Sequence, residues 1–201
     1  GILAASSITL LARGPLSARE DIRSNNGSII LSALDDNSDG AGEEDNLLII
    51  DGVSVSAVKG DISLNAGDDL TIESGATVAA ASHLVLQGDY NSADTAGSTI
   101  LVDGEIGGTS IAISGAADKD VIQLNGSITD TNAASDADSG IIVISAGAGD
   151  DTINLDLNAL VGYTEVRGET GADDISVNRL HARSEVLDLD GGEGADDYYI
   201  K

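Results

Sequence analysis

The sequence contains no cysteine, methionine, tryptophan or phenylalanine, and its only aromatic residues of the Phe, Trp and Tyr class are four tyrosines. Without cysteine the chain can form no disulfide, thiolate nucleophile or cysteine-based zinc site. Without large aromatic side chains the core must be built from valine, isoleucine, leucine and alanine, which predicts a narrow interior of stacked aliphatic side chains. Pro15 is the single proline, and no Pro-rich or Ser-rich linker marks an internal boundary.

Basic residues are scarce as well. The 201 residues include 9 Lys and Arg against 35 Asp and Glu, a formal net charge of −26. This charge argues against nucleic acid or an anionic membrane as partner and favours cations. We also expect no insertion into a membrane. The hydrophobic content of 41% is too high for an acidic disordered tail, so we expect the chain to fold. The segment GILAASSITLL is too short to span a bilayer and follows no basic region, and we interpret it as mature structure within a longer parent chain.

A pattern of three short apolar strands repeats along the chain. The segments 60–88 and 143–168 share the same order: a strand, a Gly-Asp turn, a second strand, a small turn and a third strand. The period is about 22 residues where no loop intervenes. First strands are predicted near Ile8, Ile29, Ile62, Leu84, Ile111, Ile141, Val166 and Val186. Second strands are predicted near Leu48, Ile72, Leu101, Ile122, Ile153, Ile175 and Tyr198.

Such strands cannot bury a face alone, and the constant period predicts an all-β, single-stranded, right-handed parallel β-helix of about eight coils, with three short strands per coil. The right hand follows from the general preference of parallel crossovers. An antiparallel sandwich would not repeat the same Gly-Asp turn after every first strand. Longer intervals correspond to loops at 34–46, 87–98 and 129–140. An aliphatic ladder is predicted on one wall, formed by Ile62, Leu64, Leu84, Leu86, Ile111, Ile113, Ile142, Ile144, Val166 and Leu187.

The turns between first and second strands have equal length in the last four repeats. They read SGAADKDVI, SAGAGDDTI, RGETGADDI and DGGEGADDY, and they begin at residues 114, 145, 167 and 190. Stacked coils align one aspartate of each turn in a column, ~5 Å from the next: Asp120, Asp151, Asp173 and Asp196. Like charges at that spacing repel one another, and a divalent cation between coils would turn the repulsion into binding energy. One isolated Gly-Asp pair merely makes a good turn, but four aligned turns favour the cation.

These turns resemble the RTX nonapeptide G-G-x-G-x-D-x-U-x, in which U is a large apolar residue and the repeats bind calcium. GGEGADDYY (191–199) matches every fixed position, and AGAGDDTIN (146–154) lacks only the first glycine. The resemblance covers four turns and implies calcium, a cation that takes six to eight oxygens. It makes the column aspartates the first ligands, with side chains of Asp118, Asp150, Asp174 and Asp197 as second choices and carbonyls near Gly147, Gly168 and Gly191 completing the shell.

The rest of the pattern, such as 60–78, looks like filamentous-haemagglutinin-type large exoproteins. We therefore expect one β-helix segment over 1–201, with coils lacking clear metal turns over 1–110 and coils with RTX-like turns over 111–201. The expected role is structural, as in an adhesin stalk that is extracellular or on the bacterial cell surface. The expected partners are calcium and either further coils of the parent chain or another copy end to end. The alternatives are a filament or surface-layer subunit, and a β-helical polysaccharide lyase or epimerase.

An enzyme would need a base beside the carboxylates, and the sequence shows no such cluster. His83 and His181 lie near predicted turns from third to first strands, and we interpret them as surface residues. Arg167, Arg179 and Arg183 are expected to neutralise nearby acidic side chains. In the earlier repeats, Asp68 and Ser98 occupy the position of the column aspartates in shorter turns, and we expect the metal column to begin only after them.

Overall fold

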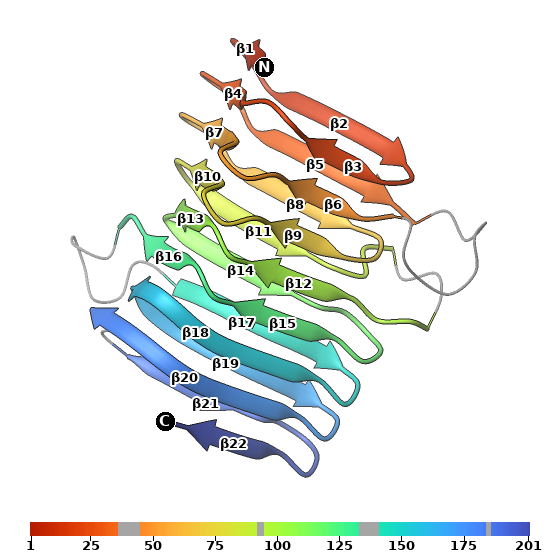
Figure 1. Ribbon diagram of the computed structural model, residues 1–201, viewed down its shortest axis with the longest axis vertical. Coiled ribbons are helices and arrows are strands. Elements are labelled where there is room, and N and C mark those ends of the chain that lie inside the picture. Colours follow the sequence, from red (N-terminus) through yellow and green to blue (C-terminus); the bar gives the residue numbers. More distant parts are fainter. Residues whose placement is uncertain (36–44, 92–94, 133–140, 184–185) are drawn as a thin grey trace.

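The computed structural model describes residues 1–35, 45–91, 95–132, 141–183 and 186–201; the side chains of residues 180–183 lie outside this description. All regular secondary structure in these ranges is β-strand. Every strand pairing is parallel and joins strands from successive repeats, so the chain stacks into two sheets (Figure 1). This is the arrangement of a parallel β-helix, and it confirms the all-β, parallel part of the prediction.

The first strands of the repeats form one sheet of eight strands. In stacking order they are β2 (Ile8–Arg13), β5 (Ile29–Leu34), β8 (Ile62–Ala66), β11 (His83–Gln87), β14 (Ser110–Ser114), β17 (Ile141–Ala148), β19 (Tyr163–Thr170) and β21 (Leu187–Asp190). Seven of the eight predicted centres lie inside these strands, and Val186 immediately precedes β21.

The second and third strands of the repeats belong to one sheet of 14 strands. Its second strands are β3 (Leu16–Ala18), β6 (Leu47–Ile49), β9 (Leu70–Ile72), β12 (Thr99–Val102), β15 (Val121–Leu124), β18 (Thr152–Val161), β20 (Asp174–Arg183) and β22 (Asp197–Ile200). Its third strands are β1 (Ile2–Ala4), β4 (Ile22–Ser24), β7 (Ser54–Ala57), β10 (Thr77–Ala80), β13 (Glu105–Gly108) and β16 (Ser127–Asp130).

Three strands per coil hold only as far as β16, which corrects the prediction for the later repeats. β18 pairs with β15 near its start and with β16 near its end, so one strand of ten residues takes the place of a second and a third strand. β20 does the same. In four of the five earlier repeats the turn between these strands contains a glycine, at Gly52, Gly75, Gly104 or Gly126. Residues 152–161 contain no glycine, and their buried positions 153, 155, 157 and 160 change phase once within the continuous strand. The later coils therefore have two strands each.

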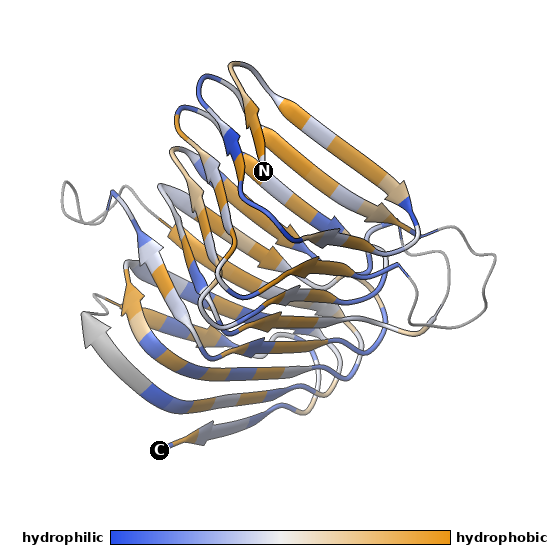
Figure 2. Ribbon diagram, turned by 45° about the horizontal axis from the view of Figure 1, so that its top comes forward, coloured by the Kyte–Doolittle hydropathy of each residue, from blue (hydrophilic) through white to orange (hydrophobic). Residues whose placement is uncertain are grey.

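Alternation of apolar and polar residues along the strands places one face of each strand in a narrow core (Figure 2). The predicted ladder on the eight-stranded sheet is confirmed. Ile62, Leu84, Ile111 and Ile142 are in register on successive strands and are fully buried. Its last predicted member, Leu187, is only partly buried.

The predicted loops at 34–46 and 87–98 lie between the first and second strands of one repeat, and the loop at 129–140 lies between the third strand of one repeat and the first strand of the next. Their flanking residues follow β5, β11 and β16, and residues 36–44, 92–94 and 133–140 lie outside the described part of the chain.

Candidate metal centre

The four aspartates predicted to align do form a column, at the corner where strands of the eight-stranded sheet turn into those of the larger sheet. The register that pairs Ile122 with Ile153, Ile153 with Ile175 and Ile175 with Tyr198 fixes their alignment. In each successive pair, Oδ1 of the aspartate that comes later in the chain accepts the backbone N–H of the aspartate one coil earlier. The N–H of Asp120 donates to Asp151 at 2.7 Å, that of Asp151 to Asp173 at 2.9 Å and that of Asp173 to Asp196 at 3.2 Å. We call these four residues the aspartate column.

The column lies inside the corner and not on its surface. Each aspartate precedes an inward-facing residue by two positions, so its side chain points to the same side of the strand. Asp120, Asp151 and Asp173 are 0%, 1% and 1% exposed, and Asp196 in the last described coil is half-buried. Burial raises the pKa of Asp120 and Asp173, and it raises the pKa of Asp151 to about 6, because neighbouring carboxylates add to the cost of ionisation.

The second carboxylate oxygen distinguishes the members of the column. In Asp120, Oδ2 accepts the N–H of Ala116 at 2.9 Å, while Oδ1 accepts both the N–H and the hydroxyl of Ser98. In Asp151 and Asp173, Oδ2 is buried and has no hydrogen-bond partner. Two successive coils therefore each hold a buried anionic oxygen with unused capacity to accept a proton or bind a cation.

Two of the three glycines named as carbonyl donors, Gly168 and Gly191, lie against this column. At Gly168 a Cβ atom would lie 2.2 Å from Oδ2 of Asp173 and 2.4 Å from the carbonyl oxygen of Gly191. At Gly191 it would lie 2.3 Å from Oδ2 of Asp196. Both sites need glycine because oxygens occupy the space of a side chain. Gly147 instead has a φ of 111°, and Asp118, which stands where the nonapeptide has glycine, has a φ of 82°.

The second-choice ligands do not join the column. Asp150, Asp174 and Asp197 are exposed, because each neighbours a column residue along the chain and faces the opposite way. Oδ1 of Asp150 accepts the N–H of Ala172 in the next coil at 3.0 Å. Asp118 is half-buried in its turn.

Sequence reasoning missed an earlier use of the same contact. Oδ2 of Asp68 accepts the N–H of Asp45 at 2.8 Å, across one coil step. Asp45 precedes the buried Leu47 by two positions, the same spacing that identified the later aspartates, so this signal was present in the sequence. Ser98, which stands at the position of a column aspartate, has a role as a donor, since its N–H and hydroxyl both donate to Asp120. Aspartates at this corner thus accept turn N–H groups both before and within the column.

In the described ranges no three His, Asp or Glu side chains come close enough together to hold a metal ion. The column instead brings together one carboxylate oxygen and one carbonyl oxygen. These are Oδ2 of Asp173 and the carbonyl oxygen of Gly191, and both lie beside Gly168. Calcium accepts carbonyl and water oxygens besides carboxylates. The donor set therefore suits a hard cation chemically, with few carboxylates per ion.

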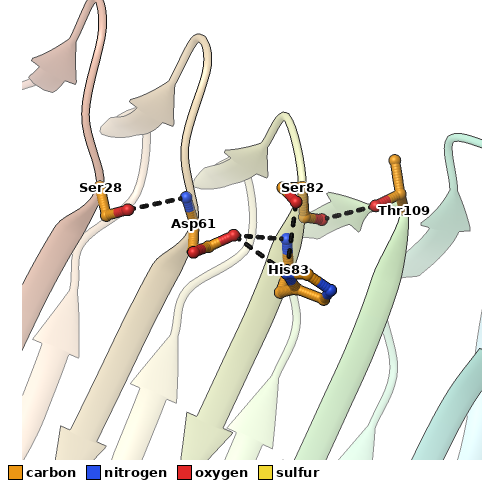
Figure 3. Close-up of polar contacts among 5 residues, drawn as sticks. All are labelled: Ser28, Asp61, Ser82, His83 and Thr109. Atoms are coloured by element: carbon orange, nitrogen blue, oxygen red, sulfur yellow. Dashed lines mark hydrogen bonds and ion pairs between the residues drawn. The ribbon is translucent and has the colours of Figure 1, made fainter.

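A second polar cluster lies where third strands turn into first strands (Figure 3). His83 Nδ1 is 3.1 Å from Oδ1 of Asp61 and 3.2 Å from Oγ of Ser82. Oδ1 of Asp61 also accepts the N–H of His83, and this bond is the main reason why the pKa of Asp61 is lowered. A Ser-His-Asp relay needs the serine and the aspartate on opposite ring nitrogens, whereas here both contact Nδ1. The cluster joins neighbouring coils, as Ser28 and Thr109 do on either side (Figure 3).

Two of the three arginines that were predicted to neutralise acidic side chains do so. Arg167 contacts Glu165, and Arg179 lies 3.0 Å from Asp156. The side chains of Arg183 and His181 are among those outside the description. Burial and the nearby carboxylate of Glu165 raise the pKa of Tyr163, which favours the protonated phenol over the phenolate that a base would need.

Comparison of the chain with protein-family models, curated proteins and solved structures found no match. None of the described residues belongs to a helix that is long and apolar enough to cross a membrane.

Proposed function

We propose that the chain is a calcium-stabilised structural segment of a secreted or surface-anchored bacterial protein, such as an adhesin stalk. In this proposal the chain winds to the right in about eight turns and belongs with RTX-like and filamentous-haemagglutinin-like exoproteins. The observation that carries it is the aspartate column, in which Asp151 and Asp173 each keep a buried Oδ2 without a partner. Leaving a buried carboxylate oxygen unsatisfied is costly, and a bound cation would remove this penalty.

Asp151, Asp173 and the carbonyl group of Gly191 would hold the ion, with Asp196 in the last described coil as a further ligand. When bound, calcium supplies positive charge that lets neighbouring carboxylates remain ionised. The column keeps its Oδ1 atoms for turn N–H groups and so fixes the spacing between coils. We propose no catalytic role, and the pairing of Arg167 and Arg179 with acidic side chains supports this.

Calcium titration with a matched pair of variants tests the proposal. The column variant carries Asp151→Asn and Asp173→Asn, and the control carries Glu20→Gln and Asp188→Asn, which remove the same charge from exposed positions. Extracellular calcium modules bind with Kd of ~10⁻⁴ to 10⁻³ M, and saturation to one hundred times Kd stabilises by ~2.7 kcal/mol per site. Calcium should raise the Tm of the wild type and of the control but not of the column variant. Equal responses in all three, or no heat of binding by calorimetry, would refute the calcium role.

A further inference from the structure

A trough with a polar and a mixed part crosses the outer face of the third strands. It consists of two adjoining cavities of about 290 and 340 Å³ that share Thr77, Glu105 and Ser127. These three residues are in register on β10, β13 and β16, and Ala159 of β18 continues the row. Three strand spacings of ~4.8 Å make the trough ~14 Å long.

Gly107 lies in the floor of the trough, and the fold does not require a glycine there. Its φ lies outside the left-handed region, and the register of β13 with β16 runs through it without a bulge. A Cβ atom at Gly107 would meet its nearest neighbour, the carbonyl oxygen of Thr129, at an ordinary 3.5 Å. By contrast, a Cβ atom at Gly126 would lie 1.8 Å from the carbonyl oxygen of Gly104.

Glycine weakens a strand interior, and where neither a bulge nor a bend explains it, glycine marks a place where a ligand or another backbone approaches closely. No atom of the described chain occupies the space above Gly107 within van der Waals distance except Thr129 and the side chain of Thr131 at 3.8 Å. The residue keeps the trough open at the cost of local strand stability. This points to an external occupant.

The lining defines the chemistry of that occupant. Hydroxyl groups of Ser74, Thr77 and Ser127 line the trough together with the carboxylates of Asp103 and Glu105 and the amide of Asn158. No lysine, arginine or aromatic residue is among the lining residues of either cavity. The wall therefore offers hydrogen-bond donors and acceptors and negative charge, which suit a ligand rich in hydroxyl or amino groups and repel an anion.

We propose that this trough binds a short, non-anionic oligosaccharide along the solenoid axis, across β10, β13, β16 and β18. A peptide is the less suitable occupant, because the trough lies on a sheet face, where the strand N–H and C=O groups are already paired and cannot take up a further strand. The proposal concerns a surface separate from the aspartate column and does not depend on calcium.

Calorimetry with three trisaccharides tests the inference: glucosamine trimer (cationic), N-acetylglucosamine trimer (neutral) and trigalacturonate (anionic). We expect the first two to bind and the third not to bind. Gly107→Val should fill the floor and weaken binding at least tenfold while leaving the Tm unchanged or higher, since valine suits a strand. Ala112→Val, at an outward position between Val85 and Val143 on the other sheet, is the matched control and should bind as the wild type does. Glu105→Gln should reduce the preference for the cationic sugar.

Three results would overturn the inference. The first is absence of heat with both non-anionic sugars at millimolar concentration. The second is a lower Tm for Gly107→Val, which would mean that the fold itself requires this glycine. The third is tighter binding of trilysine than of either sugar, which would make the trough a site for basic peptides.

Discussion

Replacing Asp151 by asparagine should make the calcium-free protein more stable at neutral pH, although it removes a buried native side chain. Asparagine has the same shape, and its Oδ1 can still accept the N–H of Asp120. Its amide places a donor where the carboxylate has a buried oxygen without a partner. The substitution therefore keeps the contact between coils and removes only the charge.

The magnitude follows from the pKa of Asp151, which the fold raises from 3.8 to about 6. At ~1.4 kcal/mol per unit the shift is equivalent to about 3 kcal/mol, an upper bound for a corner that water can reach by local opening. Because the folded pKa lies above the unfolded value, the protonated carboxyl favours folding. This contribution is complete below about pH 4 and is lost as the pH rises through about 6.

Urea unfolding in metal-free buffer between pH 4 and pH 8, followed by far-ultraviolet circular dichroism, measures this effect. The wild type should lose stability in the C-terminal coils from pH 4 to pH 8, and Asp151→Asn should lose less over the same range. The two proteins should be nearly equal at pH 4 and should differ most at pH 8. Parallel pH profiles, or a variant that is less stable than the wild type at pH 8, would refute the assignment of Asp151 as a buried, destabilising charge.

Three further substitutions, the first with a matched control, test the stacking of the coils. Gly171→Ala should destabilise by about 2 kcal/mol or more, because φ is 145° and the new Cβ would lie 1.6 Å from the carbonyl oxygen of Gly149; Gly14→Ala, with φ of 122° and open space, should cost only ~1 kcal/mol in the same urea assay. Ile153→Ala should cost about 2–5 kcal/mol, since this side chain is fully buried, and hydrogen exchange should show the loss in β15, β18 and β20. Asn65→Ala should cost about 1–3 kcal/mol in thermal unfolding, because it removes the hydrogen bond that Asn65 donates to the buried hydroxyl of Ser32. A cost near zero would show that this hydrogen bond does not stabilise the stack.

The repeat made most of the fold predictable. Short strands with alternating aliphatic residues and a constant period require stacking, and the register of Leu84 with Ile62 and Ile111 follows from that period. The merging of second and third strands in β18 was not predicted, because the constant period extended the predicted three-strand pattern into 152–161. The missing glycine in that segment was a partial signal, since four of the five earlier turns contain glycine and the turn at 19–21 does not.

The site was predictable in position but not in its contacts. Equal turn lengths placed Asp120, Asp151 and Asp173 in one column, but their burial inside the corner was not predicted, although each precedes an inward isoleucine by two positions. The sequence does not show which groups a carboxylate will meet. Turn N–H groups in a stacked coil need acceptors, and the Oδ1 atoms of the aspartates supply them. The buried Oδ2 atoms of Asp151 and Asp173 are left to bind a proton or a cation.

The parallel pairing of all strands has a mechanical consequence. The backbone hydrogen bonds between coils run along the stacking direction. Tension along that direction is therefore carried by every coil boundary in series. The end coil would peel away first while the coils behind it remain intact, because each coil contacts only its neighbours. A repeat of about 22 residues, released at up to ~3.3 Å per residue, lengthens the chain by ~70 Å. Under force, such a rod would extend in steps of one coil, and a cation bound in the aspartate column would raise the force needed for the steps in its half.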